Sequence, residues 1–229
     1  MDLSHLNESQ KEAVIKTEGP VMILAGAGSG KTRTLVSRIQ YLLDEKKVSP
    51  FRVLAVTFSN KAAREMRERV TSENDLDLGA IQITTFHSFC SRVLRSEAQF
   101  LGLSRNFTIY DTSESKSIIK AILGKRGINQ KEIHPNEVQY YIDGLKNLGY
   151  YSKCRDHEVI DEIDKEDLFF DFFQEYEMEL HRYNAVDFGG LITGVLNLFD
   201  TFPEVLERYQ KRFHYVLVDE YQDTNRAQF

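Results

Sequence analysis

The sequence predicts an α/β fold, in which a parallel sheet is flanked by helices and interrupted by an inserted, mainly helical subdomain. Two observations predict it. Short apolar runs at 21–24, 52–58, 81–86 and 214–219 lie close to amphipathic helical patterns, and the region between about residues 111 and 212 is helical with few strands. Strands that alternate with helices are typical of a doubly wound parallel sheet.

The first predicted strand, residues 21–24, leads into a Gly-rich loop. Its unbroken apolar character fits a strand that is buried on both faces. The loop consists of Ala25, Gly26, Ala27, Gly28, Ser29, Gly30, Lys31 and Thr32. Backbone N–H groups of such a loop bind phosphate ahead of a helix, so the loop predicts a nucleoside triphosphate site. A chance Gly-rich turn is the alternative, and the order strand, loop, helix argues against it.

Two side chains at the end of the loop have the chemistry that the phosphates require. Lys31 would carry a positive charge to the β and γ phosphates, and the Thr32 hydroxyl would hold Mg²⁺. Ala25 stands where the usual pattern has Gly, and this exchange of one small residue for another leaves the later geometry of the loop untouched.

The other elements are expected in regular order along the chain. Sheet strands are predicted at 52–58, 81–86 and 214–219, with helices at 32–44, 60–70 and 87–100. The insert is predicted to hold a short strand at 107–110 and helices near 113–123, 135–148, 166–183, 188–199 and 203–213. The predicted domains are therefore 1–110, an ATP-binding domain; 111–212, a helical insert; and 213–229, the return to the first domain.

Aromatic residues are dense in the insert. Phe169, Phe170, Phe172, Phe173 and Tyr176 recur at helical spacing, which favours core packing over a surface that stacks on bases. Eleven carboxylates lie between residues 156 and 179 with one lysine among them, and such a run most often marks a solvated helix face.

Composition places the chain among globular proteins. With 229 residues and 41% apolar content it can bury a core, and it has neither an apolar run long enough for a membrane span nor a signal peptide, so a cytoplasmic location is predicted. Cys90 and Cys154 lack metal-ligand spacing and are expected to be reduced thiols. The net charge of −6 is uneven: residues 1–150 carry 21 Lys+Arg against 17 Asp+Glu, and the remainder 8 against 18. The negative net charge therefore does not exclude a basic groove in the first part.

The last predicted strand ends in two carboxylates, Asp219 and Glu220. Asp219 would hold Mg²⁺ opposite Thr32, and Glu220 would orient and polarise the attacking water. Alone, an apolar strand followed by Asp-Glu could equally end in a surface turn. Together with Lys31 and Thr32, it indicates the second half of a nucleotide site.

Ordered motifs over essentially the whole chain resemble the UvrD/Rep/PcrA-like superfamily 1 DNA helicases. The motifs are 6–10 (LNESQ), 25–32 (AGAGSGKT), 57–63 (TFSNKAA), 84–88 (TTFHS) and 218–225 (VDEYQDTN). Residues 187–191 resemble a helix start that precedes the last of these. Ser59 stands where Thr is frequent and Tyr221 where Phe is frequent. The resemblance implies a RecA-like P-loop NTPase domain carrying a helical insert, and ATP and Mg²⁺ as cofactors.

The resemblance also implies roles for further residues. Gln10 would recognise adenine, since an amide offers a donor and an acceptor together, and Gln222 would sense the γ-phosphate. Arg33 would pack on the base or sugar, although an exposed helix arginine is the alternative. The implied catalytic residues are Lys31, Glu220 and Gln222, and the implied metal ligands are Thr32 and Asp219.

Candidate single-strand contacts lie where two predicted strands end. They are Thr57, Phe58, Ser59, Asn60, Thr85, Phe86 and His87. Hydroxyls and amides at helix starts suit phosphates, and aromatic rings suit unstacked bases, so binding independent of sequence is expected. Burial is the alternative for Phe58 and Phe86. On the next helix, Glu65 and Glu68 alternate with the basic residues, which favours ordinary helix ion pairs.

By resemblance, the complete protein would be a 3′–5′ helicase or translocase on single strands and duplex junctions, acting in repair or replication with repair proteins as partners. A second motor domain beyond Phe229 would supply arginine fingers, so this chain alone is expected to hydrolyse ATP very slowly. Two alternatives stay open: the motor part of a helicase-nuclease, and a nucleotide- or single-strand-binding module without turnover. A small-molecule kinase is disfavoured by the Gln10 motif and the large insert.

Overall fold

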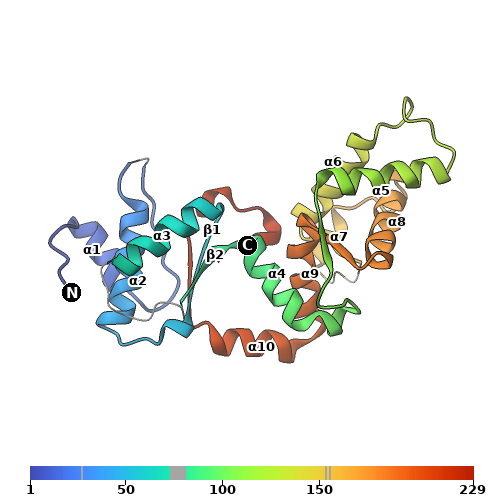
Figure 1. Cartoon of the computed structure of the whole chain (residues 1–229). Helices are drawn as coiled ribbons and strands as arrows, with labels where there is room; N and C mark the ends of the chain where they lie inside the picture. Colours follow the sequence, from blue (N-terminus) through green and yellow to red (C-terminus); the bar gives the residue numbers. More distant parts are fainter. Residues whose placement is uncertain (27, 73–80, 153, 155) are drawn as a thin grey trace. The chain divides into compact units, whose positions relative to one another are not determined.

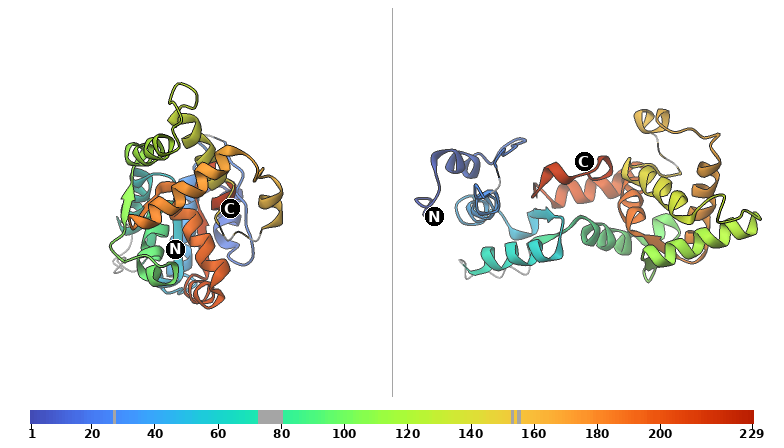
Figure 2. Two further views of the ribbon diagram at one scale, coloured as in Figure 1. Left: turned by 90° about the vertical axis from the view of Figure 1, so that its right-hand side faces the viewer. Right: turned by 90° about the horizontal axis from the view of Figure 1, so that it is seen from above.

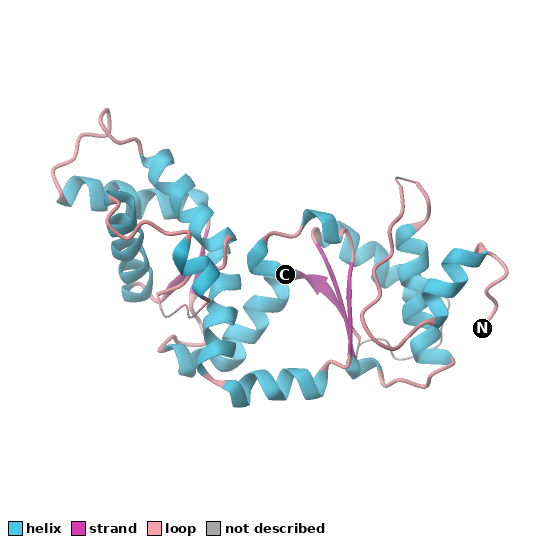
Figure 3. Cartoon of the chain, turned by 180° about the vertical axis from the view of Figure 1, so that it is seen from behind, coloured by secondary structure: helices cyan, strands magenta, loops and turns pink. Residues whose placement is uncertain are grey.

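A computed structural model describes residues 1–26, 28–72, 81–152, 154 and 156–229. The chain forms two compact units (Figures 1 and 3). The sheet unit contains Met1–Phe86 and Glu207–Gln222, and the helical unit contains His87–Leu206 and Asp223–Phe229. The chain crosses between the units after Phe86, Leu206 and Gln222, whereas the predicted domain boundaries lie at 110/111 and 212/213. The domain assignment stays a prediction.

Parallel strands form the centre of the sheet unit. In its described residues the strand order is β2 (Gln82–Thr85), β1 (Val53–Thr57), β5 (Tyr215–Val218), with β1 parallel to both neighbours. Figure 1 shows the red strand β5 beside β1, although the two are far apart in the sequence. The predicted return of the last strand to the sheet is therefore confirmed, as are the strands predicted at 52–58 and 81–86.

Apolar helix faces cover this sheet. In α2 (Lys31–Asp44), the buried residues Leu35, Ile39 and Leu42 recur at helical spacing and pack in one core with Ala63 and Met66 of α3 (Asn60–Ser72). Figure 2 shows α1 (Glu8–Ile15) beside α2, which is viewed end-on in the right-hand picture. The helices predicted at 32–44 and 60–70 are confirmed, whereas α1 was not predicted.

The prediction of a buried strand at 21–24 is wrong. These residues form no strand, and the Leu24 side chain is 88% exposed. A strand needs a neighbour that shares its backbone hydrogen bonds, and the described strands give 21–24 none. Val216 of β5 is also 57% exposed, although it belongs to a strand. An apolar run thus supplies residues that suit a strand, but it does not show which strand would pair with it.

The helical unit follows the predicted order with small shifts. Its elements are α4 (Phe86–Glu97, whose first residue belongs to the sheet unit), β3 (Thr108–Tyr110), α5 (Thr112–Lys125), α6 (Pro135–Asn147), α7 (His157–Asp161), α8 (Leu168–Arg182), β4 (Ala185–Asp187), α9 (Phe188–Thr201) and the start of α10 (Pro203–Arg212), which belongs to the sheet unit from Glu207 on. Short 3₁₀ turns lie at Ala98–Leu101 and Arg226–Gln228 in the helical unit, at Pro50–Arg52 in the sheet unit, and at Tyr221–Asp223, where the chain passes from the sheet unit to the helical unit. β3 pairs with β4 in parallel. The sequence did not predict β4 or α7.

Aromatic residues of α8 fill the core of this unit, as predicted. Phe170, Phe172, Phe173 and Tyr176 are buried, with Phe169 packed against them. Cys90 is also buried, and burial raises the pKa of its thiol to about 12. Both cysteines are free thiols.

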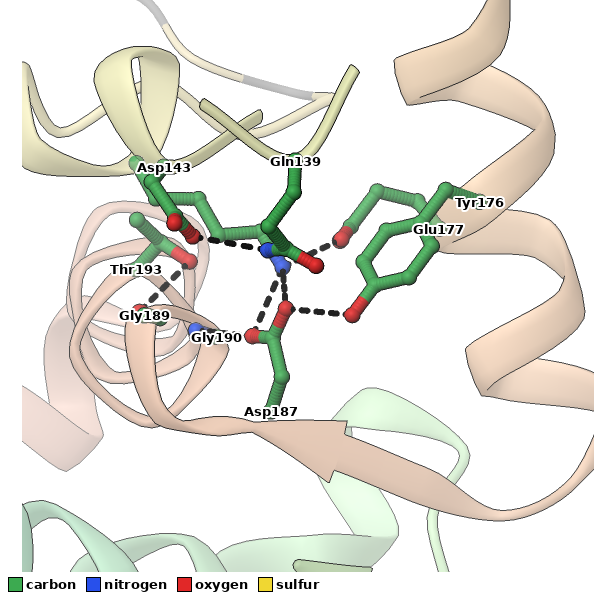
Figure 4. Close-up of polar contacts among 9 residues, drawn as sticks. Gln139, Asp143, Tyr176, Glu177, Asp187, Gly189, Gly190 and Thr193 are labelled. Atoms are coloured by element: carbon green, nitrogen blue, oxygen red, sulfur yellow. Dashed lines mark hydrogen bonds and ion pairs between the residues drawn. The ribbon is translucent and has the colours of Figure 1, made fainter. Parts of the chain in front are cut away.

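A buried ion pair joins α6 to the start of α9. The Lys146 Nζ lies 2.7 Å and 2.8 Å from the two carboxylate oxygens of Asp187 and 2.6 Å from Oε1 of Glu177. Figure 4 shows Asp187 also accepting hydrogen bonds from the Tyr176 hydroxyl, at 2.8 Å, and from the Gly190 backbone N–H. Each oxygen of this buried carboxylate therefore has partners, and Asp187 caps the N-terminus of α9.

Charge pairing outweighs burial in this network. Burial by itself would lower the pKa of Lys146 and raise that of Asp187, but their mutual attraction raises the pKa of Lys146 and lowers that of Asp187. Asp187 accordingly contributes stability above its unfolded pKa of about 3.9, and this contribution is lost as the pH falls through its lower folded pKa.

Replacing Lys146 tests this pairing. Lys146→Met leaves Asp187 and Glu177 without their cation, which should cost about 3–5 kcal/mol of unfolding free energy at pH 7. The pKa of Asp187 should then rise through burial, so the deficit relative to wild type should shrink as the pH approaches about 4. Urea unfolding at several pH values measures both effects. Lys120→Met, at an exposed position of α5, is the control, and a deficit that does not change with pH would contradict the prediction.

Candidate nucleotide and nucleic-acid site

Two glycines turn the loop into α2. Gly28 and Gly30 have φ angles of 74° and 89°, in the left-handed region that residues with a Cβ avoid. Gly30 is the N-cap residue of α2, and Ser29 closes the turn by donating its hydroxyl to the Gly26 carbonyl at 2.6 Å. Lys31 and Thr32 therefore open the helix, where backbone N–H groups lack helical partners. Ala27 lies outside the described residues.

Gln10 lies against this loop. Its side-chain Nε2 donates to the Ser29 carbonyl at 2.9 Å, while its Oε1 accepts from the Asn7 backbone N–H at 3.0 Å within a capping box of α1. The amide predicted to recognise adenine thus has both polar atoms engaged in holding α1 to the loop. Its role toward a base stays a prediction.

Lys31 reaches the carboxylates that follow β5. Its Nζ lies 3.4 Å from Oε2 of Glu220, and Gln222 donates a hydrogen bond to the same oxygen. Glu220 has a φ of 51°, a left-handed conformation that is uncommon for a residue with a side chain. The structure therefore joins three residues predicted to be catalytic, from opposite ends of the chain.

The two adjacent carboxyls have opposite electrostatic environments. Asp219 is 8% exposed, and burial followed by the charge of Glu220 raises its pKa. The hydrogen bond from Gln222, followed by Lys31, lowers the pKa of Glu220. Asp219 is thus a carboxylate that a cation would stabilise, whereas Glu220 is already balanced by Lys31.

This arrangement suits a magnesium ion that keeps part of its water shell. No group of three or more His, Cys, Asp or Glu side chains in the described part of the chain could enclose a metal. Mg²⁺ with a nucleotide usually needs only one or two protein carboxylates, because phosphates and waters complete its octahedron. Asp219, with Thr32 at the start of α2, has the right donor chemistry.

A cavity of about 470 Å³ adjoins these groups. Lys31, Asp219, Glu220 and Gln222 line it, together with residues 19–23 and the edge of β5. Pockets of a few hundred cubic ångströms are typical of small-molecule sites. Of the other predicted nucleotide residues, Thr32 is half-buried and Arg33 is exposed, and neither is among the lining residues.

The predicted nucleic-acid residues fall at the carboxyl ends of β1 and β2. Because Thr57 pairs with Thr85 in the parallel register, Phe58 and Phe86 follow at the same edge. Their ring centroids lie 5.7 Å apart in an edge-to-face arrangement. Phe58 is 38% exposed and Phe86 half-buried, so the alternative of full burial is excluded for Phe58.

The other members of this set differ in accessibility. Thr57 and Thr85 are buried, whereas Ser59 and Asn60 are exposed, and the Ser59 hydroxyl caps α3 by accepting from the Ala62 backbone N–H at 3.1 Å. Lys61 pairs with Glu65 and Arg64 with Glu68 along α3, which confirms the predicted helix ion pairs.

His87 lies in the helical unit, next to an aromatic residue that was not among the predicted contacts. The His87 and Phe188 ring centroids are 5.7 Å apart, and burial lowers the pKa of His87. Phe188 is exposed and opens α9 directly after Asp187. The only signal in the sequence was its place at that helix start, which says nothing of its neighbour.

A Gly-rich loop that opens a helix packed on a parallel sheet, with its lysine beside an Asp-Glu pair, defines the chain as a P-loop NTPase-like domain. Residues 6–229 match the family described as the UvrD/REP helicase N-terminal domain, and the chain belongs to this family.

Two relatives agree with that family. The chain is 48% identical over 227 residues to the ATP-dependent DNA helicase PcrA of Staphylococcus aureus and 45% identical to that of Staphylococcus epidermidis. Each match covers 99% of this chain and 31% of the relative, so the chain spans about a third of the length of these relatives. No helix in the described part of the chain has the length and apolar character to cross a membrane.

Neutralising Asp219 should stabilise the chain in the absence of ligand. The raised pKa means that ionised Asp219 opposes folding at neutral pH, above its unfolded pKa, and Asp219→Asn removes that charge. We expect the Tm in EDTA to rise, because a gain in unfolding free energy shifts the Tm upward. Thermal unfolding measures the shift. Asp223→Asn, at an exposed position, is the control, and an unchanged or lower Tm for Asp219→Asn would contradict the prediction.

Proposed function

We propose that this chain is the ATP-binding, single-strand-binding N-terminal part of an ATP-dependent DNA helicase. The observation that carries the proposal is the ion pair between Lys31, at the end of the Gly-rich loop, and Glu220, after β5. The names of the relatives support the activity of the complete protein. A cytoplasmic location stays a prediction.

Each nucleotide residue has a proposed task. Lys31 binds the β and γ phosphates and releases Glu220, which then orients and polarises the attacking water. Thr32 and Asp219 hold Mg²⁺, whose charge neutralises the phosphates when it is bound. Gln222 senses the γ-phosphate through the amide that now contacts Glu220. Gln10 recognises adenine, the remaining loop residues from Ala25 to Gly30 bind phosphate through their backbone, and Arg33 packs on the base or sugar.

The proposed track for a DNA strand begins at the edge where β1 and β2 end. Ser59 and Asn60 are exposed at the start of α3, where helix N–H groups favour phosphate. Phe58 offers an exposed ring for stacking, and the resemblance adds Thr57, Thr85, Phe86 and His87. Stacking does not distinguish bases, so binding is independent of sequence.

Turnover by this chain alone is proposed to be slow. Arginine fingers contribute about 10³- to 10⁵-fold in related phosphoryl transfer, and the family resemblance assigns them to a second motor domain outside these residues. Movement in the 3′–5′ direction, action at duplex junctions and contacts with repair proteins are proposed for the complete protein only.

Two substitutions separate binding from hydrolysis. Lys31→Ala should abolish binding of a fluorescent ATP analogue with Mg²⁺, because the phosphates lose their cation, while Glu220→Gln should retain binding within a few-fold. ATP turnover with and without oligo-dT, in this chain and in the complete protein, should be lost in both variants. Lys46→Ala, at an exposed position, is the control. Equal loss of binding in both variants would refute the division of roles.

Phe58 tests the proposed strand track. Phe58→Ala should weaken oligo-dT binding by roughly 5- to 150-fold, because stacking contributes about 1–3 kcal/mol per base. Fluorescence anisotropy at fixed salt measures the change. Phe51→Ala is a matched control, since Phe51 is an exposed phenylalanine just before the opposite end of β1. If both variants bind like wild type, Phe58 does not contact the strand.

A further inference from the structure

The segment after the Asp-Glu pair belongs to the helical unit. β5, Asp219, Glu220 and Gln222 lie in the sheet unit, and the chain enters the helical unit at Asp223. Glu220 and the first residue of that segment are therefore only three positions apart. Since a residue spans at most about 3.6 Å of chain, whatever holds the segment also limits where Glu220 and Gln222 can lie.

Arg226 makes the ion pairs that hold this segment. Its Nη2 lies 3.0 Å from Oε2 of Glu158 and 3.4 Å from Oδ2 of Asp156, and its Nη1 lies 3.1 Å from Oε1 of Glu162. These three carboxylates come from α7 and its two flanking residues. Asp156 uses its other oxygen to cap α7, accepting from the Glu158 backbone N–H at 3.0 Å.

Neutral contacts on both sides complete the attachment. Asn225 donates its side-chain N–H to Oδ1 of Asn147 at 2.7 Å and forms a capping box with Gln228. Ala227 is buried and lies close to Gly149. A Cβ added at Gly149 would lie 3.6 Å from the Cα of Ala227. The segment is thus fixed at three consecutive residues, of which only Arg226 carries a charge.

Electrostatics makes this attachment depend on Arg226. Without the guanidinium, three carboxylates that converge on one point would repel one another, and only the neutral contacts of Asn225 and Ala227 would hold the segment. Three carboxylates of the acidic run that was predicted to be a solvated helix face, Asp156, Glu158 and Glu162, therefore form ion pairs with one arginine. Arg226 is 33% exposed, so each ion pair is individually modest and sensitive to salt.

We propose that Arg226, with Asp156, Glu158 and Glu162, is a positioning anchor for Glu220 and Gln222. The anchor holds the chain after the Asp-Glu pair and so restrains the water-orienting carboxylate at its left-handed backbone position. This role rests on the proposed function of Glu220 and Gln222 in ATP hydrolysis, whereas the anchoring itself does not.

Another arginine of the same unit provides a matched control. Arg126 binds Glu175, at 2.5 Å, and Asp171, at 3.6 Å, which belong to the same acidic run but to α8. Arg126 directly follows α5, and both α5 and α8 are far in sequence from the Asp-Glu pair. Loss of either arginine removes comparable ion pairs, so only an effect specific to Arg226 reports on the anchor.

Hydrogen–deuterium exchange of this chain tests the anchor directly. Arg226→Ala should speed exchange of the backbone amides from Glu220 to Asn225 by about fivefold or more, because the released segment opens more often. Arg126→Ala should leave those amides within about twofold of wild type. Raising KCl from about 0.1 to 1 M should speed exchange there in wild type more than in Arg226→Ala. Equal exchange in wild type and Arg226→Ala, or equal acceleration by both variants, would overturn the proposal.

A functional measurement separates this proposal from the one on which it rests. In the complete protein, Arg226→Ala should lower kcat for ATP by roughly threefold or more while KM changes less, because the misplaced group acts in the chemical step. Arg226→Glu combined with Glu162→Arg should recover part of the loss by restoring an ion pair. If wild type neither binds nor hydrolyses ATP, the proposed function fails, and the exchange comparison still decides whether Arg226 anchors the segment.

Discussion

Parallel pairing of β1 with β2 and β5 is the constraint on which the candidate site depends. In parallel strands the carboxyl ends meet at one edge, so Phe58, Phe86 and Asp219 follow strands that end together. Residues more than a hundred positions apart thereby become neighbours. The groups proposed to bind a nucleotide and the exposed ring proposed to bind a strand then share one sheet, so the two proposed sites are physically connected.

The ion pairs of the two units differ in how far they are exposed to solvent. In the sheet unit, Lys31 and Glu220 are partly exposed, as the proposed exchange of Glu220 for a phosphate requires. In the helical unit, Lys146 and Asp187 are buried and join α6 to β4 and the start of α9. Arg226 lies between these extremes, since its ion pairs are accessible to salt yet fix the segment that continues from Glu220.

Burial also explains which sequence predictions succeeded. The core aromatic residues of α8 and the apolar faces of α2 and α3 were predicted because a 3.6-residue period reports directly on one buried helix face. The strand predicted at 21–24 was wrong because its residues had apolar side chains but no backbone partner among the described strands. The short strand β4 was missed because its three residues lie directly between two helical patterns. The pairing of Arg226 with α7 left no local pattern, because it joins segments that are far apart in the sequence.

The sequence by itself determined most of the order of strands and helices, the Gly-rich loop and the Asp-Glu pair, because each depends on neighbouring residues in the chain. It also indicated the family through ordered motifs, which the family match supports. Only the tertiary structure decided that Gln10 lies against Ser29, that Asp219 is buried beside Glu220, and that Lys146 is enclosed by carboxylates. These features depend on contacts between distant segments, where dielectric surroundings and hydrogen-bond partners are fixed only after the chain has packed.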